Sequence, residues 1–248
     1  MNKVLFYLRR SMIPVIAVVS SGLLFTACLK DSDYNNPDIP AAGLLSFNLA
    51  PDQSGMVIRL SGNSLTREPL SYTGFTGNYQ NIYVGDRNIE AFNYNSSNRL
   101  TSSSYNFEKD KYYSLFVTGN NGAYRNIVSV DNFDSLSASS GKAYVRYINA
   151  ITDSVNASTV TIAAGGSNVV NDNAAYGAVG EFTAVTPGSI TIAVKNNNGV
   201  DANRSINVEQ KKAYTVLLIG VPGATDEDKK VQIKFINNGT LADSTANQ

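Results

Sequence analysis

The side chains that perform most enzyme chemistry are scarce in this sequence of 248 residues. It contains no histidine and a single cysteine, Cys28. Histidine-dependent catalytic triads and histidine-ligated metal sites are therefore excluded, and one cysteine cannot form an internal disulfide. The glycine-rich loops that bind phosphates in Walker-type and dinucleotide-binding proteins are also missing. We therefore expect no catalytic residue, no cofactor and no bound metal.

Carboxylates alone could still act in pairs or hold calcium. A two-carboxylate glycosidase needs only two acids at a cleft, but the surroundings of the acidic residues do not single out a pair. Residues 131–134 and 226–228 are acidic clusters, and oxygen ligands suffice for calcium. Neither cluster has the spacing of a known calcium loop, so we interpret both as solvated turns.

The segment that precedes Cys28 indicates export. Three basic residues and no acidic one accompany an almost wholly apolar run over residues 12–27. This run is shorter than the roughly 20 residues of a membrane-spanning helix and ends on a small residue, which is typical of a signal peptide. Residues 23–28, Leu-Leu-Phe-Thr-Ala-Cys, resemble the lipobox at which bacterial lipoproteins are cleaved and lipidated. We predict that residues 1–27 are removed and that Cys28 carries the lipid (a palmitate-type acyl modification).

The residues behind Cys28 indicate where such a lipoprotein would reside. Residues 28–42 form a polar stretch without apolar periodicity, which predicts a flexible tether. Asp31 and Asp33 resemble the export tag that sends some lipoproteins of the Bacteroidota to the cell surface. The chain after residue 27 has 17 basic and 20 acidic side chains, a net charge of −3, whereas a nucleic-acid-binding surface would be basic. We expect a lipid anchor in the outer membrane, an outward-facing protein and no nucleic-acid partner.

Short strand-like segments fill the remainder of the chain. Residues 189–195, Ser-Ile-Thr-Ile-Ala-Val-Lys, alternate between polar and apolar, which is the period of a half-buried strand. Similar segments are rich in Val, Ile, Tyr and Thr and are separated by turn-forming Gly, Asn, Asp and Ser. The other expected strands are Leu44–Ala50, Met56–Leu60, Arg87–Tyr94, Tyr112–Val117, Tyr124–Val130, Lys142–Ile148, Ala157–Ala163, Ser205–Val208, Ala213–Ile219 and Lys230–Ile236. Sustained helical periodicity is missing behind the tether, so the predicted fold class is all-β.

The strand-like segments repeat at an offset of about 100 residues, the size of one small β-sandwich. The similar segments are 45–50 and 145–150, 84–89 and 187–192, and 108–116 and 209–217. They occur in the same order, which indicates two copies of one domain. The predicted organisation is a first sandwich over 43–134, a linker over 135–140, a second sandwich over 141–238 and a polar tail over 239–248.

Three motifs of the second copy are similar to a known family. They are Tyr-Ile-Asn-Ala at 147–150, Thr-Pro-Gly-Ser-Ile-Thr at 186–191 and Lys-Ala-Tyr-Thr-Val at 212–216. Together they resemble the Ig-like domain-of-unknown-function family found in tandem in bacterial secreted proteins and lipoproteins. The first copy departs from this pattern with Val84 in place of the proline. The resemblance implies an Ig-like β-sandwich for each copy, and it implies no activity because none is assigned to the family.

Aromatic residues are unusually dense in the first copy. Strand packing accounts for most of them. Tyr72, Phe75 and Tyr79 differ because they lie in a Gly-, Ser-, Thr- and Asn-rich stretch, Ser71–Gln80, that predicts a loop. Aromatic rings exposed on a loop suit sugar stacking or protein contact, with local packing as the alternative. These three residues are therefore the candidate ligand contacts.

Two serines are candidates for modification. The triplets Asp134-Ser135-Leu136 and Asp153-Ser154-Val155 match the Asp-[Ser/Thr]-apolar sequence used for periplasmic O-glycosylation in the Bacteroidota. We therefore predict O-glycosylation at Ser135, which falls at the expected linker, and name Ser154 as the second candidate.

The sequence favours a non-enzymatic surface module that binds a protein or glycan ligand or has a structural role. A fimbrillin-like pilus or adhesin subunit is one alternative. It would need a removable N-terminal strand, for which Arg59 and Arg67 are possible cleavage positions. An accessory glycan-binding lipoprotein is the other alternative, and a glycan array would distinguish it.

Overall fold

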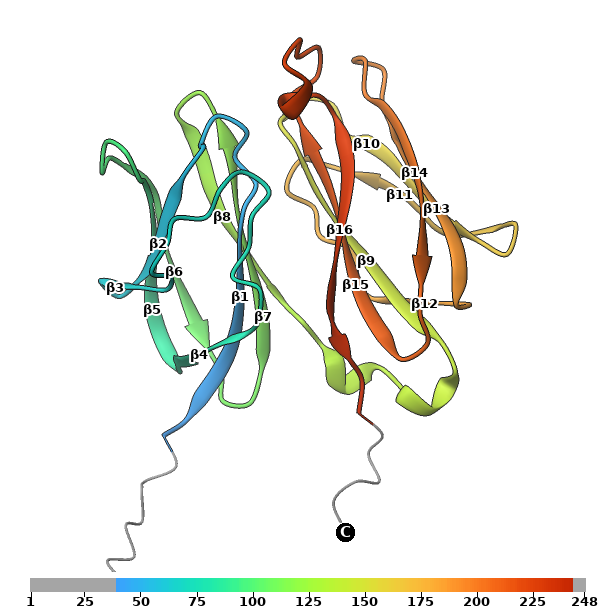
Figure 1. Ribbon diagram of the computed structural model, residues 1–248, viewed down its shortest axis with the longest axis horizontal. Coiled ribbons are helices and arrows are strands. Elements are labelled where there is room, and N and C mark those ends of the chain that lie inside the picture. The colour runs from blue at the N-terminus through green and yellow to red at the C-terminus, as the bar shows by residue number, and fades with distance from the viewer. Residues whose placement is uncertain (1–38, 243–248) are drawn as a thin grey trace, which may run out of the picture. The chain divides into compact units, whose positions relative to one another are not determined.

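The computed structural model describes residues 39–242, which form two β-sandwiches in tandem without an α-helix (Figure 1). The first sandwich consists of two four-stranded sheets with the orders β4-β1-β7-β8 and β3-β2-β5-β6. Its strands are β1 (Ala41–Asn48), β2 (Met56–Leu60), β3 (Asn63–Ser64), β4 (Gln80–Tyr83), β5 (Gly85–Asn93), β6 (Arg99–Phe107), β7 (Tyr112–Asn120) and β8 (Ala123–Val130). The predicted all-β fold class is thus confirmed.

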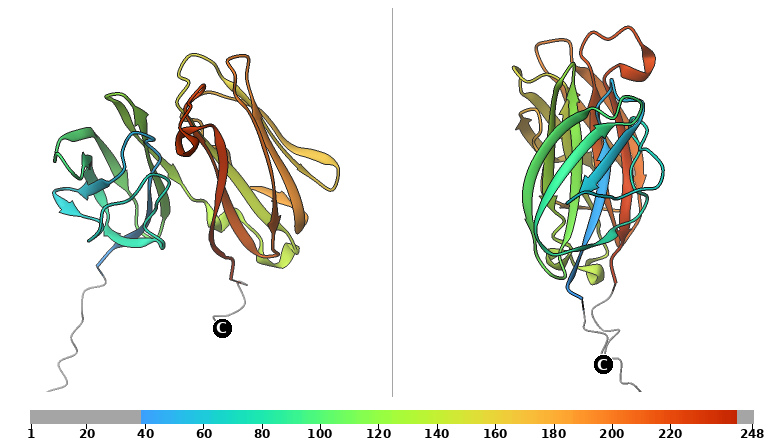
Figure 2. Two further views of the ribbon diagram at one scale, coloured as in Figure 1. Left: turned by 45° about the horizontal axis from the view of Figure 1, so that its top comes forward. Right: turned by 90° about the vertical axis from the view of Figure 1, so that its left-hand side faces the viewer.

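The second sandwich repeats the topology of the first. Its sheets have the orders β12-β9-β15-β16 and β11-β10-β13-β14, and Figure 2 shows them from two further directions. The strands are β9 (Ala143–Ile151), β10 (Ser158–Ala164), β11 (Ser167–Ala174), β12 (Thr183–Val185), β13 (Gly188–Lys195), β14 (Asp201–Val208), β15 (Lys212–Gly220) and β16 (Gln232–Thr240). Each strand of one sandwich has a topological counterpart in the other, which confirms the prediction of two tandem domains.

Each sandwich has a core of its own, built from side chains that alternate along the strands. Ile58 of β2 and Leu115 of β7 belong to the first core, and Val160 of β10 and Val216 of β15 hold similar positions in the second. All four side chains are buried. The sequence periodicity therefore identified these four strands, whereas β4, β6, β11 and β12, which also contribute core side chains, were not predicted.

One parallel pair lies at the centre of a sheet in each sandwich. Strand β1 runs parallel to β7, and β9 runs parallel to β15, whereas the other strand pairs are antiparallel. The four strands of these parallel pairs are buried over almost their whole length. Burial on two faces explains their nearly continuous apolar sequences, because a strand with one solvated face would alternate.

A third apolar cluster accounts for the burial of the outer faces. It contains Phe47 and Phe116 from the first sandwich together with Ile148 and Leu217 from the second. We call this group, completed by Leu45, Leu49, Ala150 and Ile219, the interface cluster. It joins the sheet β4-β1-β7-β8 to the sheet β12-β9-β15-β16, so the two sandwiches share an apolar interface.

Short 3-10 helices connect some of the strands. Helices η1 (Phe133–Ser135) and η2 (Ala138–Ser140) lie between β8 and β9, and η3 (Glu227–Lys229) lies between β15 and β16. Over residues 39–242 the structure has no helix that is long and apolar enough to cross a membrane. The predicted signal peptide, Cys28 and most of the tether lie outside the described residues, and the exact domain boundaries stay predictions.

Candidate functional site

The two sandwiches differ most where one strand is cut short. In the second sandwich, β11 pairs with β10 through seven residue pairs, from Ser158–Ala174 to Ala164–Ser167. Its counterpart in the first sandwich, β3, pairs with β2 through only two. Beyond β3 the chain continues irregularly, with two isolated bridges, Met56–Leu70 and Phe47–Phe75. The shortened strand leaves the edge of the first sandwich open.

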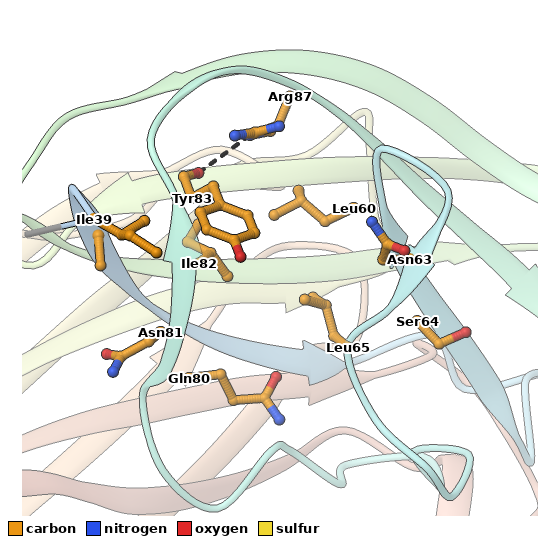
Figure 3. Close-up of a pocket in the computed structure, with 11 residues that line it drawn as sticks. Ile39, Leu60, Asn63, Ser64, Leu65, Gln80, Asn81, Ile82, Tyr83 and Arg87 are labelled. Carbon is orange, nitrogen blue, oxygen red and sulfur yellow. Dashed lines mark hydrogen bonds between the residues drawn. The ribbon is translucent and has the colours of Figure 1, made fainter. Parts of the chain in front are cut away.

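A cleft of about 580 Å³ occupies this open edge (Figure 3). We call it the β3–β4 cleft. It is lined by Ile39, Ala41, Leu60, Asn63, Ser64, Leu65, Gln80, Asn81, Ile82, Tyr83 and Arg87. Leu60 and Ile82 belong to the buried core of the sandwich, whereas the Tyr83 side chain is 62% exposed. The cleft thus combines an apolar interior with an accessible aromatic ring and several amide side chains.

Arg87 holds the Tyr83 end of the cleft in place. Its Nε donates a hydrogen bond to the Tyr83 carbonyl (3.1 Å) and its Nη2 donates one to the Val84 carbonyl (2.9 Å). The guanidinium carbon lies 5.7 Å from the centre of the Tyr83 ring, within the range of a cation–π contact. These bonds fix the guanidinium beside the C-terminal end of β4.

The residues that line the β3–β4 cleft are mostly uncharged. Arg87 is the one charged residue among them. Residues 39–242 also contain no group of three or more His, Cys, Asp or Glu side chains that could hold a metal ion. Aromatic, amide and guanidinium groups can stack on a ligand and donate or accept its hydrogen bonds.

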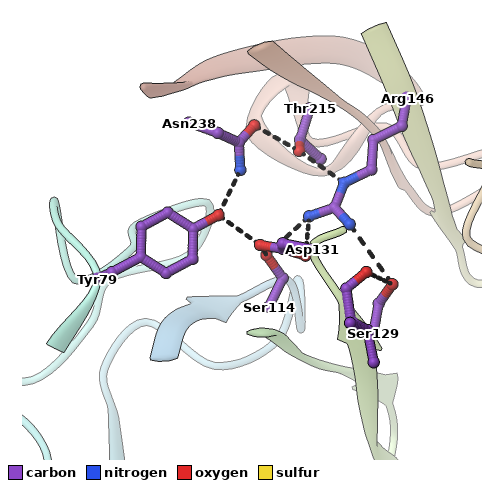
Figure 4. A network of polar contacts seen from close by, with 8 residues as sticks. Tyr79, Ser114, Ser129, Asp131, Arg146, Thr215 and Asn238 are labelled. Carbon is purple, nitrogen blue, oxygen red and sulfur yellow. Dashed lines mark hydrogen bonds and ion pairs between the residues drawn. The ribbon is translucent and has the colours of Figure 1, made fainter. Parts of the chain in front are cut away.

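A buried ion pair lies at the interface between the sandwiches (Figure 4). Arg146 of β9 approaches Asp131, which follows β8, with 2.6 Å between Nη2 and Oδ1. The side chains are 1% and 0% exposed. The Arg146 guanidinium also stacks on the ring of Phe182 at 4.4 Å. This arrangement corrects one expectation, because residues 131–134 were interpreted as a solvated turn and Asp131 is instead buried beside a positive charge.

Hydroxyl and amide groups from both sandwiches complete the network around this ion pair. Ser114 donates to Asp131 Oδ2 (2.7 Å) and accepts from Arg146 Nη2 (2.8 Å). Thr215 accepts from Arg146 Nε (3.0 Å), and the Tyr79 hydroxyl also donates to Asp131. Asp131 Oδ2 therefore accepts two hydrogen bonds, whereas Oδ1 has the contact with Arg146 and no hydrogen bond besides it; such additional bonds offset the cost of burying a charged pair. We therefore assign this network a structural role.

The three candidate ligand contacts pack against the interface instead of facing solvent. Tyr72, Phe75 and Tyr79 are all half-buried and contact the interface cluster. The Phe75 ring stacks on Phe47 with 5.5 Å between centroids. Burial raises the pKa of the Tyr79 hydroxyl, and the nearby Asp131 carboxylate raises it further. The structure therefore supports the alternative of local packing for these rings, and ligand contact by them stays a prediction.

The two serine candidates are both exposed. Ser135 lies in η1 and donates a hydrogen bond to the Asn132 carbonyl (2.8 Å). Ser154 lies in a turn that presents Val155 with 88% of its surface exposed. Both hydroxyl groups are thus accessible to a modifying enzyme, and O-glycosylation of Ser135 and Ser154 stays a prediction. Cys28, the predicted lipidation site, lies outside the described residues.

The turn that contains Ser154 is fixed by a buried carboxylate. Burial alone would raise the pKa of Asp153, but hydrogen bonds from the Asn198 and Asn156 side chains and from backbone amides, including that of Val155, outweigh this effect and hold the pKa at about 2. The donors surrounding this carboxylate are N–H groups, which do not coordinate a cation. Asp153 therefore acts as a structural anchor for the turn.

The second acidic cluster lies beside a groove of about 480 Å³ formed by both sandwiches. Asp226 and Asp228 line it together with Lys229 and Lys234. Asp226 pairs with Lys229 at 3.4 Å, and Asp228 is exposed. The acidic residues are thus solvated or paired, in agreement with the interpretation of 226–228 as a surface turn.

Sequence reasoning did not identify Tyr83 or Arg87. Arg87 lies in the repeated segment 84–89 and at the start of an expected strand, and Tyr83 directly precedes that segment, but the repeat does not mark either residue as a ligand contact. Their importance depends on the length of β3, which a local sequence pattern does not reveal. The contrast between Asn63–Ser64 and the long counterpart segment Ser167–Ala174 is the signal that could have located the cleft.

Comparison with known proteins identifies a family but no activity. The family described as Domain of unknown function (DUF4397) matches this chain twice, over residues 42–156 and 143–248. None of the curated proteins matches the chain.

Solved structures similar to the chain include two that contain carbohydrate-binding modules. One is a structure on alpha-glucan recognition by family 41 carbohydrate-binding modules from streptococcal virulence factors. Its sequence is 10% identical to this chain, its TM-score is 0.23, and the match covers 77% of this chain and 96% of that chain. The other is the family 26 module CBMbc from Eubacterium rectale Amy13K in complex with maltoheptaose, at 10% identity, a TM-score of 0.22, and 77% and 100% coverage. TM-scores of this size support no conclusion about function.

Proposed function

The chain belongs to the family described as Domain of unknown function (DUF4397), and we propose that it is a non-enzymatic surface module that binds a glycan in the β3–β4 cleft. One observation supports this proposal above all others. The short β3 opens the first sandwich next to an exposed tyrosine, whereas the long β11 occupies the corresponding edge of the second. The cleft thus lies in the first sandwich, at an edge that is covered in the second.

The groups in the cleft match the two kinds of surface that a sugar presents. A pyranose ring has an apolar face of C–H groups, which stacks on an aromatic ring, and hydroxyl groups around its edge. Tyr83 supplies the exposed ring. Asn63 and Asn81, both exposed, supply amides that can donate and accept hydrogen bonds. An apolar pocket with a few polar groups is the usual form of a small-molecule site.

The proposal includes the membrane attachment that the sequence predicts. A lipid on Cys28 would hold the protein in the outer membrane, and the residues between Cys28 and β1 would carry the sandwiches away from the surface. The predicted tether ended at residue 42, but Ala41 and Ala42 already belong to β1. More than one acyl chain is needed for stable anchoring, and a bacterial lipoprotein has several. Metabolic labelling with a palmitate analogue tests this part: the label should be lost in Cys28→Ala, and its retention would refute the anchor.

A glycan array with the purified chain tests the binding part. Tyr83→Ala should reduce binding by about tenfold or more, because stacking on an aromatic ring contributes on the order of 1 kcal/mol or more beyond area burial. Tyr94→Ala is the matched control, since Tyr94 is similarly exposed at 54% and does not line the cleft. Equal effects of the two substitutions would refute the assignment of the cleft.

A fimbrillin-like pilus subunit has less support from the geometry. Strand β1 pairs with both β4 and β7 in the middle of its sheet, so removal of the chain up to Arg59 or Arg67 would take out a central strand. SDS-resistant oligomers of increasing size would nevertheless favour this alternative over the one that we propose.

A further inference from the structure

The charge of the β3–β4 cleft is one-sided. Arg87 supplies a positive charge, and the other lining residues supply none of either sign. Among residues 39–242 no carboxylate forms an ion pair with Arg87. The adjacent Asp86 accepts a hydrogen bond from Asn106 (2.8 Å), and strand alternation directs it to the opposite face of β5. A positive charge in the cleft is therefore left without a protein counter-charge.

The bonds that Arg87 makes fix its position without using all its donors. An arginine side chain has five N–H donors, and the Tyr83 and Val84 carbonyls accept one each, from Nε and Nη2. The guanidinium is thus held next to the Tyr83 ring while the Nη1 group remains available. A fixed guanidinium is suited to carboxylate recognition because less conformational entropy is lost when the ligand binds.

We propose that the β3–β4 cleft selects acidic saccharides, in which a sugar ring stacks on Tyr83 and its carboxylate binds Arg87. This inference rests on the proposed glycan-binding function and specifies the class of glycan. A neutral sugar could stack on the Tyr83 ring and form hydrogen bonds with the amides of Asn63 and Asn81, but it would leave the Arg87 guanidinium without a negative partner. A uronate or sialate residue satisfies all three, and its charge-assisted hydrogen bond is about twice as strong as a neutral one.

The test compares acidic saccharides with neutral partners of the same ring structure. The probes are an oligogalacturonate and its methyl ester, and sialyllactose and lactose, each titrated into the purified chain by calorimetry at low and at high salt. We expect an acidic member of these pairs to bind about tenfold more tightly than its neutral partner. The preference should shrink as salt is added, because the site is open to solvent.

Variants then connect the preference to Arg87. Arg87→Gln should abolish the discrimination between the acidic and the neutral partner, and Arg87→Lys should retain only part of it because the fork geometry is lost. Arg59→Gln is the matched control: Arg59 also lies over an aromatic ring, 4.6 Å from the centre of Phe92, but does not line the cleft. Thermal unfolding of each variant shows whether a loss of binding reflects a loss of fold.

The outcomes separate this inference from the function on which it rests. Equal binding of acidic and neutral partners, or a preference that survives in a folded Arg87→Gln variant, would overturn acid selectivity and leave glycan binding intact. If every probe fails to bind and the glycan array is also negative, both proposals are overturned. Acid-selective binding that disappears in Arg87→Gln and persists in Arg59→Gln supports both.

Discussion

The buried ion pair between the sandwiches permits a quantitative test through the substitution Asp131→Asn. The amide keeps the shape of the carboxylate but removes its charge, so the Arg146 guanidinium, 1% exposed, loses its counter-charge. Breaking a buried pair by removing one partner costs about 3–5 kcal/mol. For a chain of this size, each kcal/mol lowers Tm by about 2–4 °C, so we expect a fall of roughly 6–20 °C.

Urea unfolding followed by circular dichroism measures this loss, since the chain has no tryptophan for fluorescence. Adding Arg146→Met completes a double-mutant cycle, in which we expect a coupling energy of about 1–3 kcal/mol. The exposed pair between Lys111 and Asp134, at 3.4 Å, is the control and should contribute less than about 1 kcal/mol. The reasoning would be refuted if Asp131→Asn lowered the free energy of unfolding by no more than Asp134→Asn does.

Three further substitutions test other parts of the structure. The pKa of Asp153 is lowered from 3.8 to about 2. The ionised carboxylate therefore stabilises the fold above pH 3.8, and this stabilisation is lost as the pH falls toward 2. The free energy of unfolding of wild type should drop between about pH 4 and pH 2, and that of Asp153→Asn should drop less. In Gly119→Ala, where φ is +143, the new Cβ would lie 2.2 Å from the Ala123 carbonyl oxygen. We expect this substitution to lower the free energy of unfolding by about 3 kcal/mol in urea. Gly122→Ala is the control: φ is +87 but the space around the new Cβ is open, so the loss should be about 1 kcal/mol. Phe47→Ala removes a fully buried ring from the interface cluster and should cost about 3–5 kcal/mol in the same assay; a cost below 1 kcal/mol would contradict the packing.

The sequence predicted the strands that have a clear apolar pattern and missed those that do not. Strand β6 contains a run of hydroxyl residues, Thr101–Ser104, and β11 is largely Asn and Asp. Both lie at the edge of a sheet, where a polar sequence is stable because one side remains solvated and where polar residues discourage aggregation. Periodicity alone identifies the strands that a core requires, so these edge strands escaped it.

The site was harder to predict because it depends on contacts between distant segments. Composition identified Ser71–Gln80 correctly as a mostly irregular stretch, but whether its rings are exposed is decided by the apolar face of the second sandwich. Arg146 was visible as a charge within an apolar strand, and its partner Asp131 looked like part of a solvated turn. A local pattern cannot connect them, because the linker and the start of β9 lie between the two residues.

The place where the chain enters the first sandwich has a mechanical consequence. Ile39 and Ala41 line the β3–β4 cleft, and β1 pairs with β4, which forms one wall of it. Tension between the N-terminus and a ligand in the cleft would therefore pass through β1 and β4, and the second sandwich would not be stretched. Strand β1 is hydrogen-bonded on both edges and covered on both faces, so it would resist being pulled out of its sheet. The second sandwich would then act as a brace that keeps the pulled strand in place.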